Sequence, residues 1–143
     1  MIKKLVAFVF FILTVNQNLY SKIHLSIIYY KSIIEERMDN RISSELSKEE
    51  LISKAFNYHL AGNTDEASRY YQIFIDNGFS DSRVMSNYGV ILKQKGNIKD
   101  AISLFNKSIS LNVKNPDPYC NLGVIYTNLG ELQKAELFTL KAI

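Results

Sequence analysis

Tryptophan is absent from this chain of 143 residues, and proline and cysteine are scarce, with two prolines and one cysteine. The single thiol, Cys120, has no second cysteine with which to form an internal disulfide. So few prolines fit packed helices better than a disordered chain. The net charge is only +3, and the lysines are scattered rather than gathered on a basic face with interleaved aromatic residues. This composition argues against nucleic acid as a partner.

Patterns that carry catalysis are missing as well. The sequence has no zinc-ligand spacing, no glycine-rich phosphate loop and no nucleophile–base constellation. His24 has no partner in the sequence, and a lone histidine such as His59 is more often a surface residue than a catalyst. Cys120 should be partly exposed, and without a neighbouring His or Lys it is not expected to be a nucleophile. We therefore predict a protein that is not an enzyme and uses no cofactor and no metal.

What the chain does have is an internal repeat with a period of 34 residues. The positions that recur in phase are Gly62, Gly96 and Gly130; Ala67, Ala101 and Ala135; Ala55, Gly89 and Gly123; and Tyr58, Leu92 and Tyr126. This period is typical of two-helix units, each of which buries its apolar face only against its neighbours. We predict an all-α solenoid of antiparallel helix pairs, with units at 48–81, 82–115 and 116–143, the last incomplete.

The second unit indicates where its helices begin and end. Apolar spacing predicts helices over 82–95 and 98–111. Gly96 should adopt a positive φ in the turn between them, and Asn97 should cap the helix that follows. The equivalent residues are Gly62 and Asn63 in the first unit and Gly130 in the third.

Further local signals support this layout. Ser47 and Glu50 have the spacing of a capping box at the start of the first unit. Asn115 followed by Pro116 is typical of an N-cap and first helical residue. Gly89 stands in mid-helix, where glycine costs about 1 kcal/mol relative to alanine. We therefore expect the second helix to approach closely there, through the alanine column.

The third unit resembles the tetratricopeptide repeat (TPR) family most closely. The residues that carry the resemblance are Tyr119, Leu122, Gly123, Tyr126, Gly130, Ala135 and Ala142. The pattern departs from the family at Ser108, where alanine is usual, at Thr139, where an aromatic residue is usual, and at Phe79 and Val113, which replace proline. Several columns in phase carry the resemblance over residues 48–143, about two thirds of the chain. It implies a right-handed solenoid that binds other proteins.

In TPR proteins, ligands usually lie in a concave groove lined by the first helix of each unit. The resemblance carries this groove onto Glu49, Ile52, Ser53, Phe56 and His59 in the first unit; Arg83, Ser86, Asn87, Val90, Lys93 and Gln94 in the second; and Asp117, Cys120, Asn121, Val124, Thr127 and Asn128 in the third. The family's clamp for two carboxylates is not expected, because only Asn87 matches it and Asp117 would repel an anionic tail.

Asn87 and Asn121 stand one period apart in this groove. They are similar to the asparagine ladders with which TPR arms of glycosyl-transferring enzymes hold a peptide backbone. An amide suits that task because it donates and accepts hydrogen bonds at once. The alternative is that asparagine is simply a common, soluble residue at this register, and Ser53 interrupts the ladder in the first unit.

The N-terminal residues 1–21 have the pattern of a secretory signal, with Lys3 and Lys4 before an apolar run over 5–15. That run is short for a membrane span, which needs about 20 apolar residues. Three interpretations stay open: a cleaved signal, an uncleaved anchor that would be the chain's only membrane contact, and a misplaced start codon or degenerate leader. A genuine signal implies an exported or membrane-anchored protein of the periplasm or envelope; otherwise the protein is cytoplasmic.

Residues 22–47 are expected to form an amphipathic helix or linker. Their apolar stripe consists of Ile23, Ile27, Tyr30, Ile34, Met38, Ile42 and Leu46. The helix is expected to pack on the first repeat; the alternative is a helix that binds a membrane interface or a partner.

The leading hypothesis for function is a non-catalytic module that binds an extended peptide or a partner helix in the groove. The alternative is the substrate-recruiting TPR arm of a larger transferase whose catalytic domain is not in this chain. The chain stops inside a helix without a polar capping helix, so Leu137, Leu140 and Ile143 should be partly uncovered. Either the chain is a fragment, or a partner or a second copy covers that end.

Overall fold

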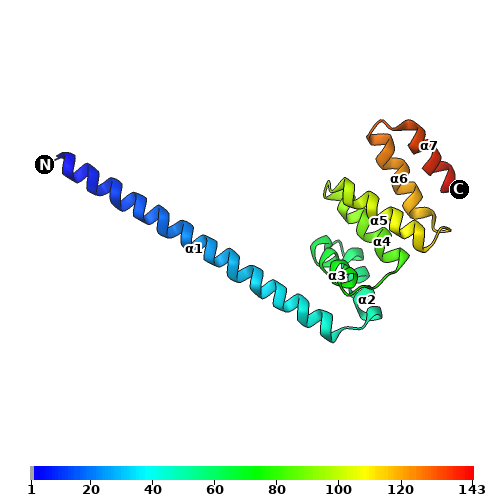
Figure 1. Ribbon diagram of the computed structural model, residues 1–143, viewed down its shortest axis with the longest axis horizontal. Helices are drawn as coiled ribbons and strands as arrows, with labels where there is room; N and C mark the ends of the chain where they lie inside the picture. Colours follow the sequence, from blue (N-terminus) through cyan, green and yellow to red (C-terminus); the bar gives the residue numbers. More distant parts are fainter. Residues whose placement is uncertain (1) are drawn as a thin grey trace. The chain divides into compact units, whose positions relative to one another are not determined.

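The computed structural model describes residues 2–143, with side chains from Gln17 onward apart from Asn18. The chain divides into two units, one that ends at Ser44 and one that spans Glu45–Ile143. Helices account for all the regular secondary structure of the described residues (Figure 1). The predicted all-α class is therefore confirmed.

The first unit is formed by one helix, α1, which runs without interruption over Ile2–Glu45, so that only its last residue belongs to the second unit. It contains the stripe predicted for 22–47 as far as Ile42, and the side chains of Ile27 and Tyr30 are 61% and 65% exposed. No second element of that unit covers them. Whether the stripe packs on the first repeat or binds a partner stays a prediction.

For most residues of the predicted signal at 1–21, the structure describes the backbone but not the side chains, and Met1 is not among the described residues. The signal therefore stays a prediction. In the part of the chain that the structure describes, no helix is both long enough and apolar enough to cross a membrane.

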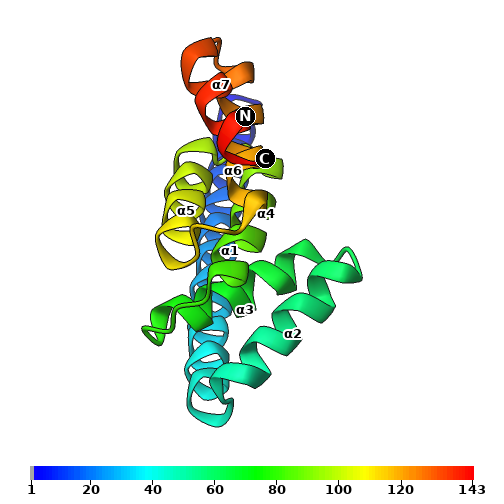
Figure 2. The same cartoon turned by 90° about the vertical axis from the view of Figure 1, so that its right-hand side faces the viewer.

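The second unit consists of helix pairs that follow one another along the chain. The pairs are α2 (Lys48–Leu60) with α3 (Thr64–Asp76), α4 (Ser82–Gln94) with α5 (Ile98–Leu111), and α6 (Pro116–Asn128) with α7 (Leu132–Lys141). Within each pair the helices pack side by side, and α3 packs on α4 and α5 on α6, which joins the pairs into a stack (Figure 2). This is the predicted solenoid, and α5 has the bounds expected for 98–111.

Most of the predicted helix ends are confirmed. Gly96 has a φ of +83°, and Gly62 and Gly130 both have +75°. A Cβ added at any of the three would meet no atom within 4 Å, so backbone conformation alone favours glycine there. The capping box of Ser47 and Glu50 is present in full.

Asn97 occupies the predicted N-cap position of α5, but among the described residues its side chain does not make the capping hydrogen bond expected there. Its counterpart Asn63 does accept a bond from the Glu66 backbone N–H, at 3.3 Å. At Asn97 the side chain is exposed, and the backbone carbonyl of the same residue accepts the first helical bond from Ala101.

The close approach predicted at Gly89 is confirmed, but the facing residue is different. A Cβ on Gly89 would lie 2.8 Å from Cε1 of the Phe105 ring rather than against Ala101. At the equivalent Gly123, the added Cβ would lie 2.7 Å from Oγ1 of Thr139. The glycine thus leaves room for the side chain that stands one helical turn beyond the alanine. In the second repeat this side chain is the fully buried ring of Phe105.

Replacing Gly89 by Ala should destabilise the protein by about 1–3 kcal/mol, because the added methyl group would overlap the Phe105 ring. The sign is diagnostic, since the same change in an unconstrained helix stabilises by about 1 kcal/mol. Urea unfolding of the full chain measures the difference, and Ser103→Ala, at an exposed site on α5, is a control that should change little. A G89A variant as stable as the wild type would contradict the close approach.

Candidate functional site

The first helices of the pairs, α2, α4 and α6, carry all the residues predicted for the groove. We use the term first-helix face for those predicted groove residues whose side chains are exposed or half-buried. Half-buried members are Phe56, His59, Asn87, Val90, Lys93 and Asn121; exposed members are Ser53, Arg83, Asp117, Val124, Thr127 and Asn128. Ser86 does not belong to it, because only 3% of its surface is exposed. It lies on the same helical stripe as Ser82 and Gly89, both of which contact α5.

A hollow of about 180 Å³ lies between the first two pairs and is lined by Phe56, His59, Leu60 and Asn87. The fully buried Tyr71 of α3 lies against it, with its ring centroid 6.1 Å from those of Phe56 and His59. Both ring pairs are edge-on. The hollow therefore combines aromatic walls with one imidazole and one amide.

The hydroxyl group of Tyr71 links the two polar groups of the hollow. Nδ1 of His59 lies 3.2 Å from it, and the side chain of Asn87 also hydrogen-bonds to it. Burial raises the pKa of Tyr71 to about 12, although the bond to Asn87 acts in the opposite direction. The phenol is therefore neutral, and Asn87 is held in place by a partner from the preceding repeat.

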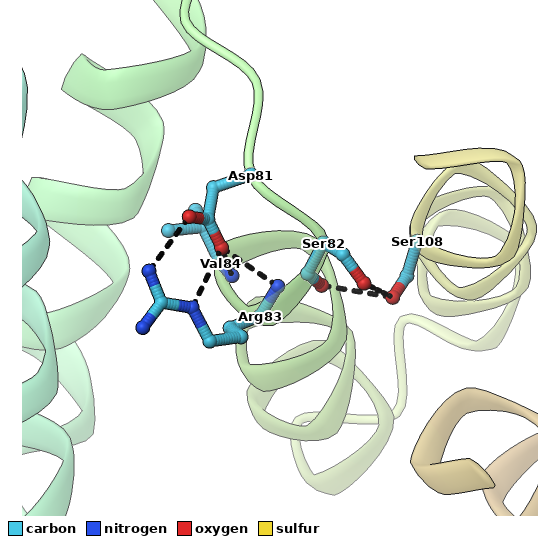
Figure 3. A network of polar contacts seen from close by, with 5 residues as sticks. All are labelled: Asp81, Ser82, Arg83, Val84 and Ser108. Atoms are coloured by element: carbon cyan, nitrogen blue, oxygen red, sulfur yellow. Dashed lines mark hydrogen bonds and ion pairs between the residues drawn. The ribbon is translucent and has the colours of Figure 1, made fainter. Parts of the chain in front are cut away.

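Arg83 borders the hollow, but its charge is already matched. Its Nη2 lies 2.8 Å from Oδ2 of Asp81, and its Nε donates to Oδ1 at 3.2 Å (Figure 3). These bonds hold the pKa of the Asp81 carboxyl below its usual range. The guanidinium carbon also lies 5.8 Å from the ring centroid of Phe56. Arg83 therefore acts as a rim group within an ion pair.

Asp81 was missed by the sequence analysis, although an acid just before an apolar helical run is a recognised N-cap signal. Its Oδ1 accepts hydrogen bonds from the backbone N–H groups of Arg83 and Val84, at 2.8 and 3.4 Å. Next to it, the hydroxyl of the buried Ser108 donates to the carbonyl of Ser82 at 2.8 Å (Figure 3). A hydroxyl at this usual alanine position thus ties α5 to the start of α4.

A second polar contact on the face joins α4 to α6. Nζ of Lys93 donates to Oδ1 of Asn121 at 2.5 Å. Nδ2 of Asn121 in turn donates to the backbone carbonyl of Asp117 at 3.0 Å. The oxygen and the nitrogen of the Asn121 amide therefore both have partners within the protein. Of these two partners, the Lys93 ammonium is charged and the Asp117 carbonyl is neutral.

The remaining predicted residues lie around these two contacts. Val124 is 52% exposed, and the hydroxyl of Thr127 donates back to the Gly123 carbonyl at 2.9 Å. Cys120 is exposed, as expected. Within the described residues, no three His, Cys, Asp or Glu side chains gather where a metal ion could bind. The face thus offers an aromatic hollow, a lysine and two anchored amides.

Comparison with known proteins matches this architecture. Residues 89–130 match the family model described as "TPR repeat". A TPR repeat-containing protein of Methanocaldococcus jannaschii is 37% identical over 65 residues, which cover 46% of this chain but only 12% of that protein. The type III secretion translocator chaperone SycD of Yersinia enterocolitica superposes with a TM-score of 0.60 and 25% identity, over 66% of this chain and 72% of its own.

The hollow should make stability depend on pH. Burial lowers the pKa of His59 below its ordinary value of 6.5, so the unfolded chain takes up the proton at higher pH than the folded chain. The contribution of His59 to the free energy of unfolding is present at a pH above 6.5, the pKa in the unfolded chain. It should be lost as the pH falls from there through the lower pKa of the folded chain. Thermal midpoints between about pH 7.5 and pH 5 measure the loss, which should be small for a partly exposed ring.

His59→Gln should remove this part of the pH dependence, while His24→Gln, at an exposed site on α1, should retain it. Identical pH profiles for the wild type and H59Q would show that the hollow does not discriminate against the charged imidazole.

Proposed function

We propose that the first-helix face of this chain, which belongs to the tetratricopeptide-repeat family, binds an extended peptide or a helix of a partner protein. TPR repeats are protein-interaction modules, and stacked helix pairs of this kind present continuous surfaces to other chains. The chaperone whose structure is similar is likewise named for acting on other proteins, the secretion translocators. An interaction module is the function that the fold supports.

The observation that carries the proposal is the hollow lined by Phe56, His59, Leu60 and Asn87. Its aromatic walls suit an apolar side chain, because burying such a group is worth about 1.5–3 kcal/mol. The amide of Asn87 stands at its edge, where it can accept from or donate to a peptide backbone. Binding sites typically combine an apolar pocket with a few placed polar groups in this way.

Anchoring of the two amides favours binding rather than opposing it. Asn87 is held by Tyr71, and Asn121 by Lys93 and the Asp117 carbonyl. An amide oxygen has two lone pairs and an amide nitrogen two hydrogens, so each group retains capacity for a ligand. Side chains that are already ordered lose less entropy when a peptide binds.

Substituting both Asn87 and Asn121 by Ala should weaken peptide binding about tenfold, the loss of roughly one to two net hydrogen bonds. The probe is the strongest peptide selected from a random dodecapeptide display library on the immobilised full-length chain, and fluorescence polarisation measures its affinity. Asn40→Ala with Asn106→Ala removes two exposed amides from other positions and is the matched control.

The double variant must also unfold at nearly the wild-type temperature, since its amides contact Tyr71 and Lys93. Unchanged affinity in a folded N87A/N121A variant would remove the amides from the binding surface. A library that yields no peptide for the wild-type chain would contradict the proposed function itself.

A further inference from the structure

We propose that Lys93 anchors a carboxylate side chain of the bound peptide, so that the partner is an extended segment with a single acidic residue near an apolar one. This inference rests on the proposed peptide-binding function and specifies the chemistry of its ligand. It follows from the charges of the first-helix face, from the partner of Lys93, and from its register relative to the hollow.

Among the described residues of the first-helix face, Arg83 and Lys93 are the arginine and lysine side chains, and only Lys93 lacks an acidic partner. Across the described residues, the ion pairs of the repeats join Arg69 to Glu66, Arg83 to Asp81, Lys95 to Asp65 and Lys134 to Glu131. The contrast with Lys95, only two residues later, is direct, because its ammonium lies 2.7 Å from the Asp65 carboxylate. Lys93 has only the neutral amide oxygen of Asn121.

That arrangement leaves the ammonium ready for an anion. An ammonium group has three N–H donors, and Asn121 takes one of them. The side chain is half-buried, so its charge is less screened than that of a fully exposed lysine. Hydrogen bonds between an ammonium and a carboxylate are roughly twice as strong as those between neutral groups. Asn121 also fixes where the ammonium lies, because its own nitrogen is bound to the Asp117 carbonyl.

Register places this cation one repeat further along the array than the hollow. Lys93 stands one repeat period after His59, which lines the hollow, and Asn121 stands one period after Asn87. A single extended peptide that lays an apolar side chain in the hollow would therefore continue along the face towards Lys93. The neutral imidazole of His59, whose pKa burial lowers, does not compete for the carboxylate.

The other charged groups of the face limit how acidic the peptide can be. Asp117 is exposed one helical turn before Asn121, and Glu49 is exposed in the first turn of α2. Arg83 is already paired with Asp81. A run of acids would meet Asp117, so the face favours one carboxylate among uncharged neighbours rather than an acidic tail.

Selection of random dodecapeptides on the full-length chain tests the inference. Peptides selected by the wild type should share one Asp or Glu at a fixed spacing from an aromatic or aliphatic residue. Peptides selected by Lys93→Glu should carry Lys or Arg at that position instead. Lys99→Glu makes the same change of net charge at an exposed site on α5 and should select the wild-type motif.

A thermodynamic cycle provides the second arm and does not depend on a charge-reversed variant that could fold poorly. The strongest peptide and its Glu→Gln or Asp→Asn form are titrated against the wild type and Lys93→Met. Each single change should weaken binding about fivefold, as for one partly exposed ion pair, and the second change should then add little.

The outcomes separate this inference from the proposed function. If the selected peptides are uncharged, or if the acid loses the same affinity on K93M as on the wild type, the anchor is wrong while peptide binding stands. If no peptide is enriched on any variant, peptide binding fails and the anchor fails with it.

Discussion

Close contact between the two helices of a pair is the constraint on which the remaining structure depends. The ring of Phe105 occupies the space that a side chain at position 89 would need. The same ring belongs to a buried cluster with Ala101 of its own helix and with Leu122 and Ile125 of α6. One aromatic residue therefore fills the notch within its repeat and supplies the contact to the next. Without the glycine, the ring could not sit deeply enough to do both.

Stacking of the pairs then determines which polar groups meet on the first-helix face. Asn87 contacts the Tyr71 hydroxyl of the preceding repeat, and Lys93 contacts Asn121 of the following one. Both contacts cross a boundary between repeats, so neither would exist in an isolated helix pair. The face is consequently ordered before any ligand arrives, and the cost of ordering these side chains is met by folding rather than by binding.

The fold could be predicted from the sequence because its signals are local and recur in phase. Gly62, Gly96 and Gly130 indicate a backbone conformation that few other residues adopt, and their common spacing indicates the repeat. The site could be predicted only as a set of positions. Their partners depend on rotamers and on neighbours in other repeats, which a helical register does not specify.

The errors show where that limit lies. Helical register alone predicts Ser86 on the face, yet the stripe that Ser86 shares with Gly89 faces α5. Ser108 of α5, which stands where alanine is usual, hydrogen-bonds to this same side of α4. Asn97 has the backbone conformation of Asn63 but not its side-chain bond. Conversely, Asp81 caps α4 and neutralises Arg83, a pairing across two residues that only the folded turn brings about.

Amide chemical-shift mapping of the full-length chain with a selected dodecapeptide tests the central claim most directly. If the stacked first helices form the binding surface, the amide resonances that move should belong to α2, α4 and α6 and should span at least two repeats. Shifts confined to α3, α5 and α7, or to α1, would show that the stacking builds a surface that the ligand does not use.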